Sequence, residues 1–419
     1  MDKILIEGGY ELNGAVTISG AKNAALPIMA ACLLAQGATT LLNMPALKDI
    51  RTMAALLRFM GAEVELGNGR AVIRAARVNE PTAPYELVKT MRASALVLGP
   101  LVARHGRARV SLPGGCSIGP RPINLHLKAL EAMGASIILD QGYITAAAPA
   151  GGLRGADFFF DQPTVTGTEN IMMAATLAQG RTILRNAALE PEVVDTAQAL
   201  ISMGASIDGY GTDVITIDGV TDLKGAEYSI MPDRIETGTF LVAAGLTRGR
   251  LTIKGAPMNC LAAVEKKLEE AGLVIERQGG DLQVAGPERI RSADIKTRPY
   301  PGFPTDMQAQ FMALMCLGSG LSVITETIFE NRFMHVSELK RLGADIRLDG
   351  NTAIIQGVPH LTSAPVMATD LRASASLILA GLAAKGQTEL ARVYHIDRGY
   401  EKIEEKLSTL GARIRRIRE

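Results

Sequence analysis

The sequence predicts an α/β protein in which one unit is repeated six times, as two domains of three pseudo-symmetric βαβαββ-type repeats. Two motifs recur along the 419 residues, each at intervals of about 70 residues. Each copy is longer than a solenoid repeat, and a chain that is 47% hydrophobic can form more than one core. The net charge is only +1 and tryptophan is absent, so a broad nucleic-acid surface and base-stacking platforms are not expected.

The first motif is an amphipathic helix that ends at a glycine and leads into a short strand. One such helix is "IRTMAALLRFM", and the glycine that follows it suits the left-handed backbone position that closes a helix. The six glycines are Gly61, Gly134, Gly204, Gly272, Gly343 and Gly411.

The second motif is a helix that is apolar nearly all round, followed by a glycine and a strand, as in "TFLVAAGLTRGRLTIKG". A helix without a polar face is expected to be buried. A further strand, such as "VITIDG", ends each of the first five units, but the sixth stops at "RIRRIRE". The N-terminal "KILIEG" has the missing pattern, so we expect Ile4–Glu7 to complete the sixth unit.

This closure predicts a discontinuous domain. We expect one domain at 22–231, and a second made of 1–21 and 232–419, with a substrate site in the cleft between them. The four cysteines form no CxxC pair, so neither a metal site nor a disulfide framework is expected. The apolar runs are too short to span a membrane, and "KILIEGG" reads as a strand rather than a signal peptide, which predicts a cytoplasmic protein.

Charged residues gather where helices are expected to start. Aspartates such as Asp233 and Asp397 are ordinary helix caps there. Cations oppose the helix dipole at this end, so they indicate an anionic ligand, a phosphate or a carboxylate. Six cations have this placement: Lys22, Arg92, Arg121, Arg332, Arg372 and Arg398.

Two further residues are candidates for chemistry. Asp306 follows the rigid turn "YPGFPT" and leads into a nearly uncharged helix, so it is either a helix cap or a general base beside an alcohol substrate. Cys116 lies in the glycine-rich loop "SLPGGCSIGPRP" near Arg121, where a reactive thiol is plausible, whereas Cys32 and Cys316 read as core residues.

Five long motifs together resemble the UDP-N-acetylglucosamine enolpyruvyl transferases: "PGGCSIGPRPINLHL", "PDRIETGTF", "YPGFPTDMQAQ", "DLRASASLILAGL" and "HIDRGYEKIEEKL". The resemblance covers essentially the whole chain and implies an inside-out α/β barrel. It implies that the 3′-hydroxyl of UDP-N-acetylglucosamine attacks C2 of phosphoenolpyruvate while C3 is protonated. The tetrahedral intermediate then loses phosphate, at the committed step of peptidoglycan synthesis, without a metal or cofactor.

The resemblance also implies roles for individual residues. Lys22, Arg121 and Arg398 look like phosphate contacts, and Arg332 and Arg372 lie closer to the carboxylate. The implied catalytic residues are Cys116, Asp306, Lys22 and Arg398. The residues implied for phosphoenolpyruvate are Lys22, Asn23, Arg92, Arg121, Arg332, Arg372 and Arg398. Those implied for the nucleotide sugar are Asn23, Arg92, Arg121, Pro122, Ile123, Asn124, Leu125, His126, Thr164, Val165, Thr166, Asp306, Ile328 and Asp370.

In this family the loop thiol, here Cys116, donates a proton to C3 or assists product release, and fosfomycin alkylates it. One departure from the family pattern is Gln162, which stands where many members have a lysine. Two alternatives stay open: a 5-enolpyruvylshikimate-3-phosphate synthase, which lacks the loop thiol, and a non-enzymatic repeat scaffold that binds an anionic partner. The oligomeric state is open as well.

Overall fold

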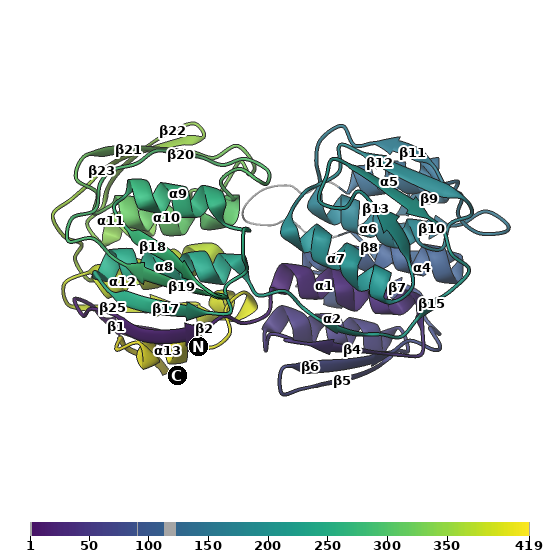
Figure 1. Cartoon of the computed structure of the whole chain (residues 1–419), viewed down its shortest axis with the longest axis horizontal. Helices are drawn as coiled ribbons and strands as arrows, with labels where there is room; N and C mark the ends of the chain where they lie inside the picture. Colours follow the sequence, from purple (N-terminus) through teal and green to yellow (C-terminus); the bar gives the residue numbers. More distant parts are fainter. Residues whose placement is uncertain (1, 90, 113–122, 419) are drawn as a thin grey trace. The chain divides into compact units, whose positions relative to one another are not determined.

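A computed structural model describes residues 2–89, 91–112 and 123–418. The chain forms two compact units, each with its own hydrophobic core. The N-terminal unit contains residues 20–112 and 123–231, and the C-terminal unit contains 2–19 and 232–418. In Figure 1 the first strand, in purple, therefore lies among the yellow elements of the chain's other end. No helix in the described residues is long and apolar enough to cross a membrane.

The N-terminal unit has three four-stranded sheets of the same topology. The first is β16 (Glu227–Ser229), β4 (Ala38–Leu42), β6 (Arg70–Arg74) and β5 (Glu63–Gly67). The second is β7 (Thr82–Ala83), β8 (Arg107–Ser111), β10 (Tyr143–Ala147) and β9 (Ser136–Asp140). The third is β11 (Asp157–Phe159), β12 (Arg181–Arg185), β14 (Val214–Asp218) and β13 (Ser206–Asp208). A two-stranded pair joins β15 (Leu223–Lys224) to β3 (Ala35–Gln36).

The helices of this unit fall into two groups. The apolar helices α1 (Lys22–Ala31), α4 (Leu98–His105) and α6 (Val165–Ala175) form the middle of the core. The amphipathic helices are α2 (Lys48–Phe59), α5 (Asn124–Ala132) and α7 (Pro191–Ser202). The short elements are α3 (Tyr85–Val88) and the 3₁₀ helices η1 (Cys32–Leu34) and η2 (Arg92–Val97).

The C-terminal unit repeats this plan. Its first sheet is β2 (Asn13–Thr17), β17 (Arg250–Lys254), β19 (Asp281–Ala285) and β18 (Val274–Gln278). Its second is β20 (Ile295–Lys296), β21 (Leu321–Thr325), β23 (Thr352–Gln356) and β22 (Asp345–Asp349). Its third is β24 (Pro365–Met367), β25 (Gln387–Ala391), β1 (Lys3–Glu7) and β26 (Arg413–Ile417).

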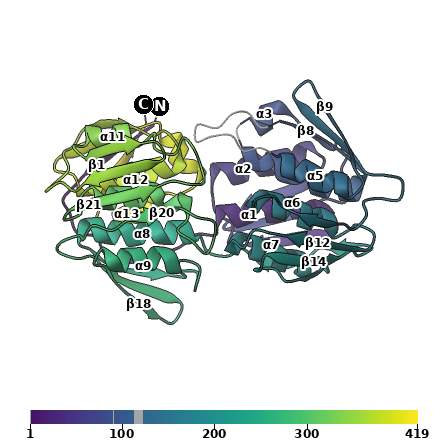
Figure 2. The ribbon, with the colours of Figure 1, turned by 90° about the horizontal axis from the view of Figure 1, so that it is seen from above.

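The three apolar helices of the C-terminal unit contact one another in the middle of its core (Figures 1 and 2). They are α8 (Arg234–Thr247), α10 (Gln308–Met315) and α12 (Leu371–Ala383). Every residue of α8 is buried, as the lack of a polar face predicts. The remaining helices are α9 (Ala262–Glu270), α11 (Val336–Arg341), α13 (Ile403–Thr409), η3 (Thr305–Met307) and η4 (Val393–Arg398). Helices inside and sheets outside make each unit an inside-out barrel.

The N-terminal strand completes the sixth repeat. β1 pairs antiparallel with both β25 and β26, and Ile4 lies opposite Leu390 and Arg416. The six glycines that end the amphipathic helices all have positive φ, from 86° at Gly343 to 106° at Gly204. Both observations agree with the repeat pattern of the sequence.

The repeat pattern did not predict the partners of the two strands that lie next to the crossings of the chain. β2 directly precedes α1 in the sequence but pairs parallel with β17 of the C-terminal unit. β16 directly precedes α8 but pairs parallel with β4 of the N-terminal unit. At each crossing, the strand that precedes the apolar helix therefore joins a sheet of one unit, while the helix itself belongs to the other unit.

Candidate active site

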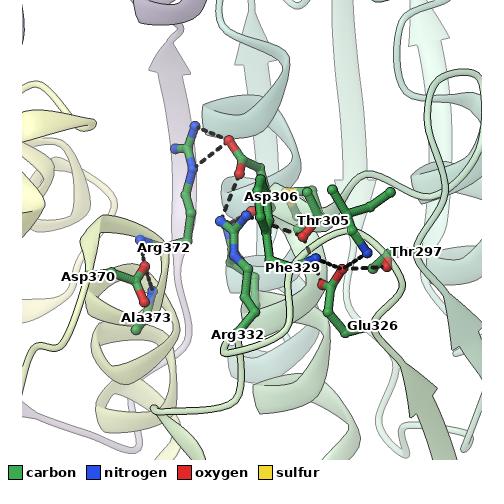
Figure 3. A network of polar contacts seen from close by, with 12 residues as sticks. Thr297, Thr305, Asp306, Glu326, Phe329, Arg332, Asp370, Arg372 and Ala373 are labelled. Atoms are coloured by element: carbon green, nitrogen blue, oxygen red, sulfur yellow. Dashed lines mark hydrogen bonds and ion pairs between the residues drawn. The ribbon is translucent and has the colours of Figure 1, made fainter. Parts of the chain in front are cut away.

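Asp306 is the centre of an ionic cluster in the C-terminal unit (Figure 3). Arg332 donates from Nη2 to Asp306 Oδ1 over 2.7 Å. Arg372 donates from Nε and Nη2 to Oδ2 over 3.1 and 2.9 Å. The side chains of Arg332 and Arg372 are only 4% and 2% exposed, while that of Asp306 is 24% exposed. Two buried guanidinium groups therefore fix the orientation of a carboxylate that solvent can still reach.

The position of Arg372 follows from the start of α12. Asp370 caps this helix, because its Oδ1 accepts the N–H groups of Arg372 and Ala373 over 2.8 and 3.0 Å. Burial by itself would lower the pKa of Arg372, but the Asp306 carboxylate outweighs it and the pKa is raised. The cap and the ion pair together hold a permanently charged guanidinium at the edge of the core.

Buried polar groups hold the backbone beneath Asp306. Gln310 donates to the Asp306 carbonyl over 2.9 Å and to the Tyr400 hydroxyl over 3.2 Å. That hydroxyl also lies 2.8 Å from the hydroxyl of Thr239, on α8. Three segments far apart in the sequence thus support one carboxylate.

The sequence left open whether Asp306 is a helix cap, and the structure decides against it. Asp306 lies inside η3, whose capping position is Pro304, and its two carboxylate oxygens accept hydrogen bonds from Arg332 and Arg372. Asp233 does cap α8, accepting the N–H groups of Ile235 and Glu236. The cap expected at Asp397 was wrong, because this carboxylate binds Arg416 instead.

Of the five candidate cations whose backbone the structure describes, two do not start a helix. Arg398 is the last residue of η4, five residues before α13, so its expected place at a helix start was wrong. Arg332 lies in a turn four residues before α11. Lys22 and Arg372 are the first and second residues of α1 and α12, as expected. Arg92 begins a 3₁₀ helix rather than an α-helix.

The N-terminal unit contains the other group of candidate residues. Lys22 is buried at the start of α1, and its Nζ lies 3.5 Å from Asp49 Oδ2. Asn23 follows it in the same turn and is partly exposed. A lysine that is almost fully buried needs a compensating charge, which Asp49 supplies here.

A hydrogen-bonded chain links His126 to two segments of this unit. Asn170 Nδ2 lies 2.9 Å from His126 Nδ1, and His126 Nε2 lies 3.4 Å from the Thr166 hydroxyl. Asn170 also accepts the Gly99 N–H and donates to the Ala95 carbonyl. Burial lowers the pKa of His126 to about 4, so the ring is neutral at pH 7. Because the Asn170 amide donates to Nδ1, the ring proton is assigned to Nε2 and faces Thr166.

The remaining expected nucleotide contacts lie at the starts of α5 and α6. Ile123 and Asn124 begin α5, with Asn124 exposed, and the Leu125 side chain is buried in the core. Thr164 caps α6 through Gly167 N–H at 3.2 Å, and Val165 is the first residue of the helix. Ile328, in the C-terminal unit, is 36% exposed. Cys116, Arg121 and Pro122 lie outside the described residues, as does the side chain of Arg92.

Two residues important for this geometry were not predicted. The Glu326 carboxylate accepts four hydrogen bonds, two from the hydroxyls of Thr297 and Thr305 and two from the backbone N–H groups of residues 328 and 329. Asn170 holds His126 and the segment that follows Arg92. The available signal was a carboxylate at the end of a strand in "LSVITE" and an amide beside an apolar run in "NIMMAA". A buried polar side chain there must find partners.

Chemically, the C-terminal cluster can orient an anion, accept a proton at an oriented carboxylate, or do both.

The model of the EPSP synthase family (3-phosphoshikimate 1-carboxyvinyltransferase) matches residues 6–407. A UDP-N-acetylglucosamine 1-carboxyvinyltransferase of Anaeromyxobacter dehalogenans is 59% identical over 421 residues, covering 100% of both chains. The protein of the same name from Desulfosudis oleivorans is 60% identical over 417 residues, again with full coverage of both.

Solved structures agree with these relatives. The enolpyruvyl transferase NikO of Streptomyces tendae has a TM-score of 0.88 at 25% identity, covering 99% of this chain and 98% of its own. An EPSP synthase of Acinetobacter baumannii shares the fold, with a TM-score of 0.76 at 19% identity and full coverage of both chains. The chain belongs to the enolpyruvyl transferase family, among the UDP-N-acetylglucosamine 1-carboxyvinyltransferases.

Proposed function

We propose that this chain transfers the enolpyruvyl group of phosphoenolpyruvate to the 3′-hydroxyl of UDP-N-acetylglucosamine and releases phosphate. Its relatives at 59–60% identity carry this activity in their names. The observation that supports the proposal most directly is Asp306, a solvent-accessible carboxylate held by two buried arginines. The reaction needs both of the properties that this group combines, a base for an alcohol and cations for an anionic substrate.

In the first half of the reaction, the 3′-oxygen forms a bond to C2 while its proton passes to Asp306. The π-electron pair of phosphoenolpyruvate takes a proton at C3, for which the Cys116 thiol is the proposed donor. In the second half, C3 gives up a proton, the C2=C3 double bond returns and the C2–O bond to phosphate breaks. Lys22, Arg121 and Arg398 are the proposed partners of the phosphate, which carries the leaving charge.

The two arginines that hold Asp306 have a second proposed task. Arg332 and Arg372 would bind the carboxylate of phosphoenolpyruvate, so the substrate competes with Asp306 for the same guanidinium groups. Binding of the substrate would then weaken the ion pairs of Asp306 and free its oxygens to accept the proton. Arg92 and Asn23 are proposed to contact both substrates, and Asp370 to bind the nucleotide sugar.

The nucleotide is proposed to bind along the segment Arg121–His126 and the start of α6, Thr164–Thr166. Of these, His126 is buried, so it supports Thr166 rather than contacting the ligand. Gln162 supplies no charge to the diphosphate where many relatives have a lysine. The product would enter peptidoglycan synthesis in the cytoplasm, and fosfomycin would inactivate the enzyme by alkylating Cys116.

Phosphate release from phosphoenolpyruvate tests the proposal. We expect release only when UDP-N-acetylglucosamine is present. Release with shikimate 3-phosphate instead would identify an EPSP synthase. No release with either acceptor, together with binding of phosphoenolpyruvate, would favour the anion-binding scaffold.

A further inference from the structure

We infer that Glu326 is a positioning residue for Arg332, and through Arg332 for the carboxylate of Asp306. Glu326 directly follows β21 and is 2% exposed. No lysine or arginine in the described part of the chain forms an ion pair with it. A buried carboxyl group without a cation is costly unless hydrogen-bond donors surround it. Its partners therefore indicate what it is for.

Four donors surround Glu326, and they come from three segments (Figure 3). Its Oε1 accepts the Thr297 hydroxyl at 2.7 Å and the N–H groups of Ile328 and Phe329 at 2.8 and 3.3 Å. Its Oε2 accepts the Thr305 hydroxyl at 2.8 Å. One side chain thus ties the end of β20, the residue before Asp306 and the loop that leads to Arg332.

The Thr305 hydroxyl connects Glu326 to Arg332. Arg332 Nη1 lies 3.2 Å from Thr305 Oγ1, and a guanidinium group can only donate. The Thr305 oxygen must therefore accept from Arg332, which leaves its single proton for Glu326. The direction of both hydrogen bonds is fixed, and Glu326 polarises the hydroxyl toward Arg332.

A second contact acts on the same guanidinium. The Phe329 N–H is bound by Glu326, and the Phe329 ring lies 5.3 Å from the guanidinium carbon of Arg332. Arg332 is thus held from two directions, and its other nitrogen, Nη2, reaches Asp306 at 2.7 Å. Because the proposed proton transfer needs an oriented carboxylate, Glu326 would affect turnover without touching a substrate. This step depends on the function proposed above.

Three variants separate this role from simple structural support. In Glu326→Gln the amide oxygen can keep the three donors at Oε1, but the NH₂ group then faces Thr305 and reverses that bond. Thr305→Val removes the hydroxyl at nearly constant volume. The third is the double variant. Thr388→Val is the matched control, because Thr388 is a fully buried threonine of the same unit whose hydroxyl has no partner in the described residues.

Steady-state kinetics are measured with saturating phosphoenolpyruvate and varied UDP-N-acetylglucosamine. We expect each single variant to lower kcat about ten- to hundredfold while KM for the nucleotide sugar changes less than about threefold. The double variant should fall to the level of Thr305→Val alone, because Glu326→Gln keeps the donors at Oε1, including Phe329 N–H, and changes only the contact with Thr305. Thr388→Val should keep the wild-type kcat. Losses that multiply in the double variant, or a wild-type kcat in Glu326→Gln, would overturn the inference.

A crystal structure of Thr305→Val gives an answer that does not depend on the substrate. We expect the Arg332 guanidinium to leave its place beside Asp306, and an unchanged Arg332–Asp306 pair would overturn the inference. If the wild-type protein turned over neither acceptor, the proposed function would fail and this structure would still decide the role of Glu326. The same structure decides it if Glu326→Gln does not fold, since Thr305→Val leaves Glu326 in place.

Discussion

At the scale of single residues, the distinctive feature is a carboxylate that is both exposed and clamped. Asp306 faces solvent with 24% of its side chain, while two almost fully buried arginines bind its two oxygens. The sequence indicated Asp306 and both arginines as site residues. It could not indicate that they bind one another, because residues 306, 332 and 372 meet only in the folded core.

Asp306→Asn tests two roles of Asp306 together, as the proposed base and as the counter-charge of Arg332 and Arg372. The amide cannot accept the proton, so we expect kcat to fall at least about 100-fold. It also leaves two buried guanidinium groups without their counter-charge, so the free energy of unfolding should fall by about 1–3 kcal/mol. UDP-N-acetylglucosamine should bind within about tenfold of normal. Asp345→Asn, on the exposed face of β22, is the control for both measurements.

The contrary result for Asp306 is clear-cut. A kcat within about threefold of wild type, at saturating substrates, would remove Asp306 as an essential base. Unchanged stability in chemical denaturation would mean that the arginines find another anion in the folded protein.

His126 predicts a pH dependence of stability. Its pKa in the folded protein is lowered to about 4 from 6.5, so the folded state binds fewer protons than the unfolded state between these values. Its contribution to stability is complete above pH 6.5 and is lost as the pH falls toward 4, about 2 kcal/mol between pH 7 and 5. His126→Gln should therefore lose less stability than wild type over this interval, as urea denaturation at the two pH values would measure.

Comparing the two proteins is essential, because Asp195 acts in the opposite direction. Burial raises its pKa to about 6, so its contribution is present at low pH and is lost as the pH rises. This effect is common to wild type and variant and cancels in their difference. Equal losses in both proteins would show that His126 is not held neutral.

Cys116 carries the prediction about the inhibitor. Cys116→Asp should keep part of the turnover, because a carboxylic acid can also donate a proton, but should lose inactivation by fosfomycin, which needs a sulfur nucleophile to open its epoxide. The measurement is residual activity after incubation with the inhibitor. Equal inactivation of wild type and variant would exclude Cys116 as the alkylated group.

At the scale of elements, β1 shows how far the repeat pattern could predict the fold. A strand missing at one end of the chain and present at the other was enough to predict its pairing. The pattern could not predict that β2 pairs with β17 and β16 with β4, because these partners lie far away in the sequence. The expected position of Arg398 at a helix start was also wrong, because this residue ends the 3₁₀ helix η4. Short helices of this kind depend on tertiary contacts more than on propensity.

Removing residues 1–8 tests the role of β1. Among the described strands, β26 would lose its only partner and β25 would lose one of two, which leaves buried backbone groups unpaired. We expect amide exchange to accelerate at Arg413–Ile417 and Gln387–Ala391. Protection lost in β4–β6 of the N-terminal unit, with β26 unaffected, would contradict this assignment.

A point substitution tests the same placement of β1 without removing the strand. A Cβ at Gly8 would lie 2.2 Å from the Ala384 carbonyl oxygen, so Gly8→Ala should also loosen β1. Gly67→Ala is the matched control, since nothing lies within 4 Å of a Cβ at that position. Equal exchange rates at β26 in these two variants would mean that the close approach at Gly8 is not needed.

At the scale of the whole molecule, two rings of three repeats each have their own core and carry their own group of candidate site residues. The repeat pattern could predict this division, because hydrophobic periodicity and glycine caps are local signals. It could not predict Glu326 and Asn170, whose importance lies in partners many residues away. We propose that both groups serve one addition–elimination reaction.

The most direct test of that claim is the product formed in D₂O. If C3 of phosphoenolpyruvate is protonated and later deprotonated, the intermediate carries a CH₂D group at C3, and every turnover in which this group loses H rather than D leaves solvent deuterium in the vinyl group of the product. We expect nuclear magnetic resonance and mass spectrometry to show a deuterated enolpyruvyl ether on the 3′-oxygen of UDP-N-acetylglucosamine, with one phosphate released per product. A vinyl group without deuterium, or an ether at another hydroxyl, would contradict this mechanism.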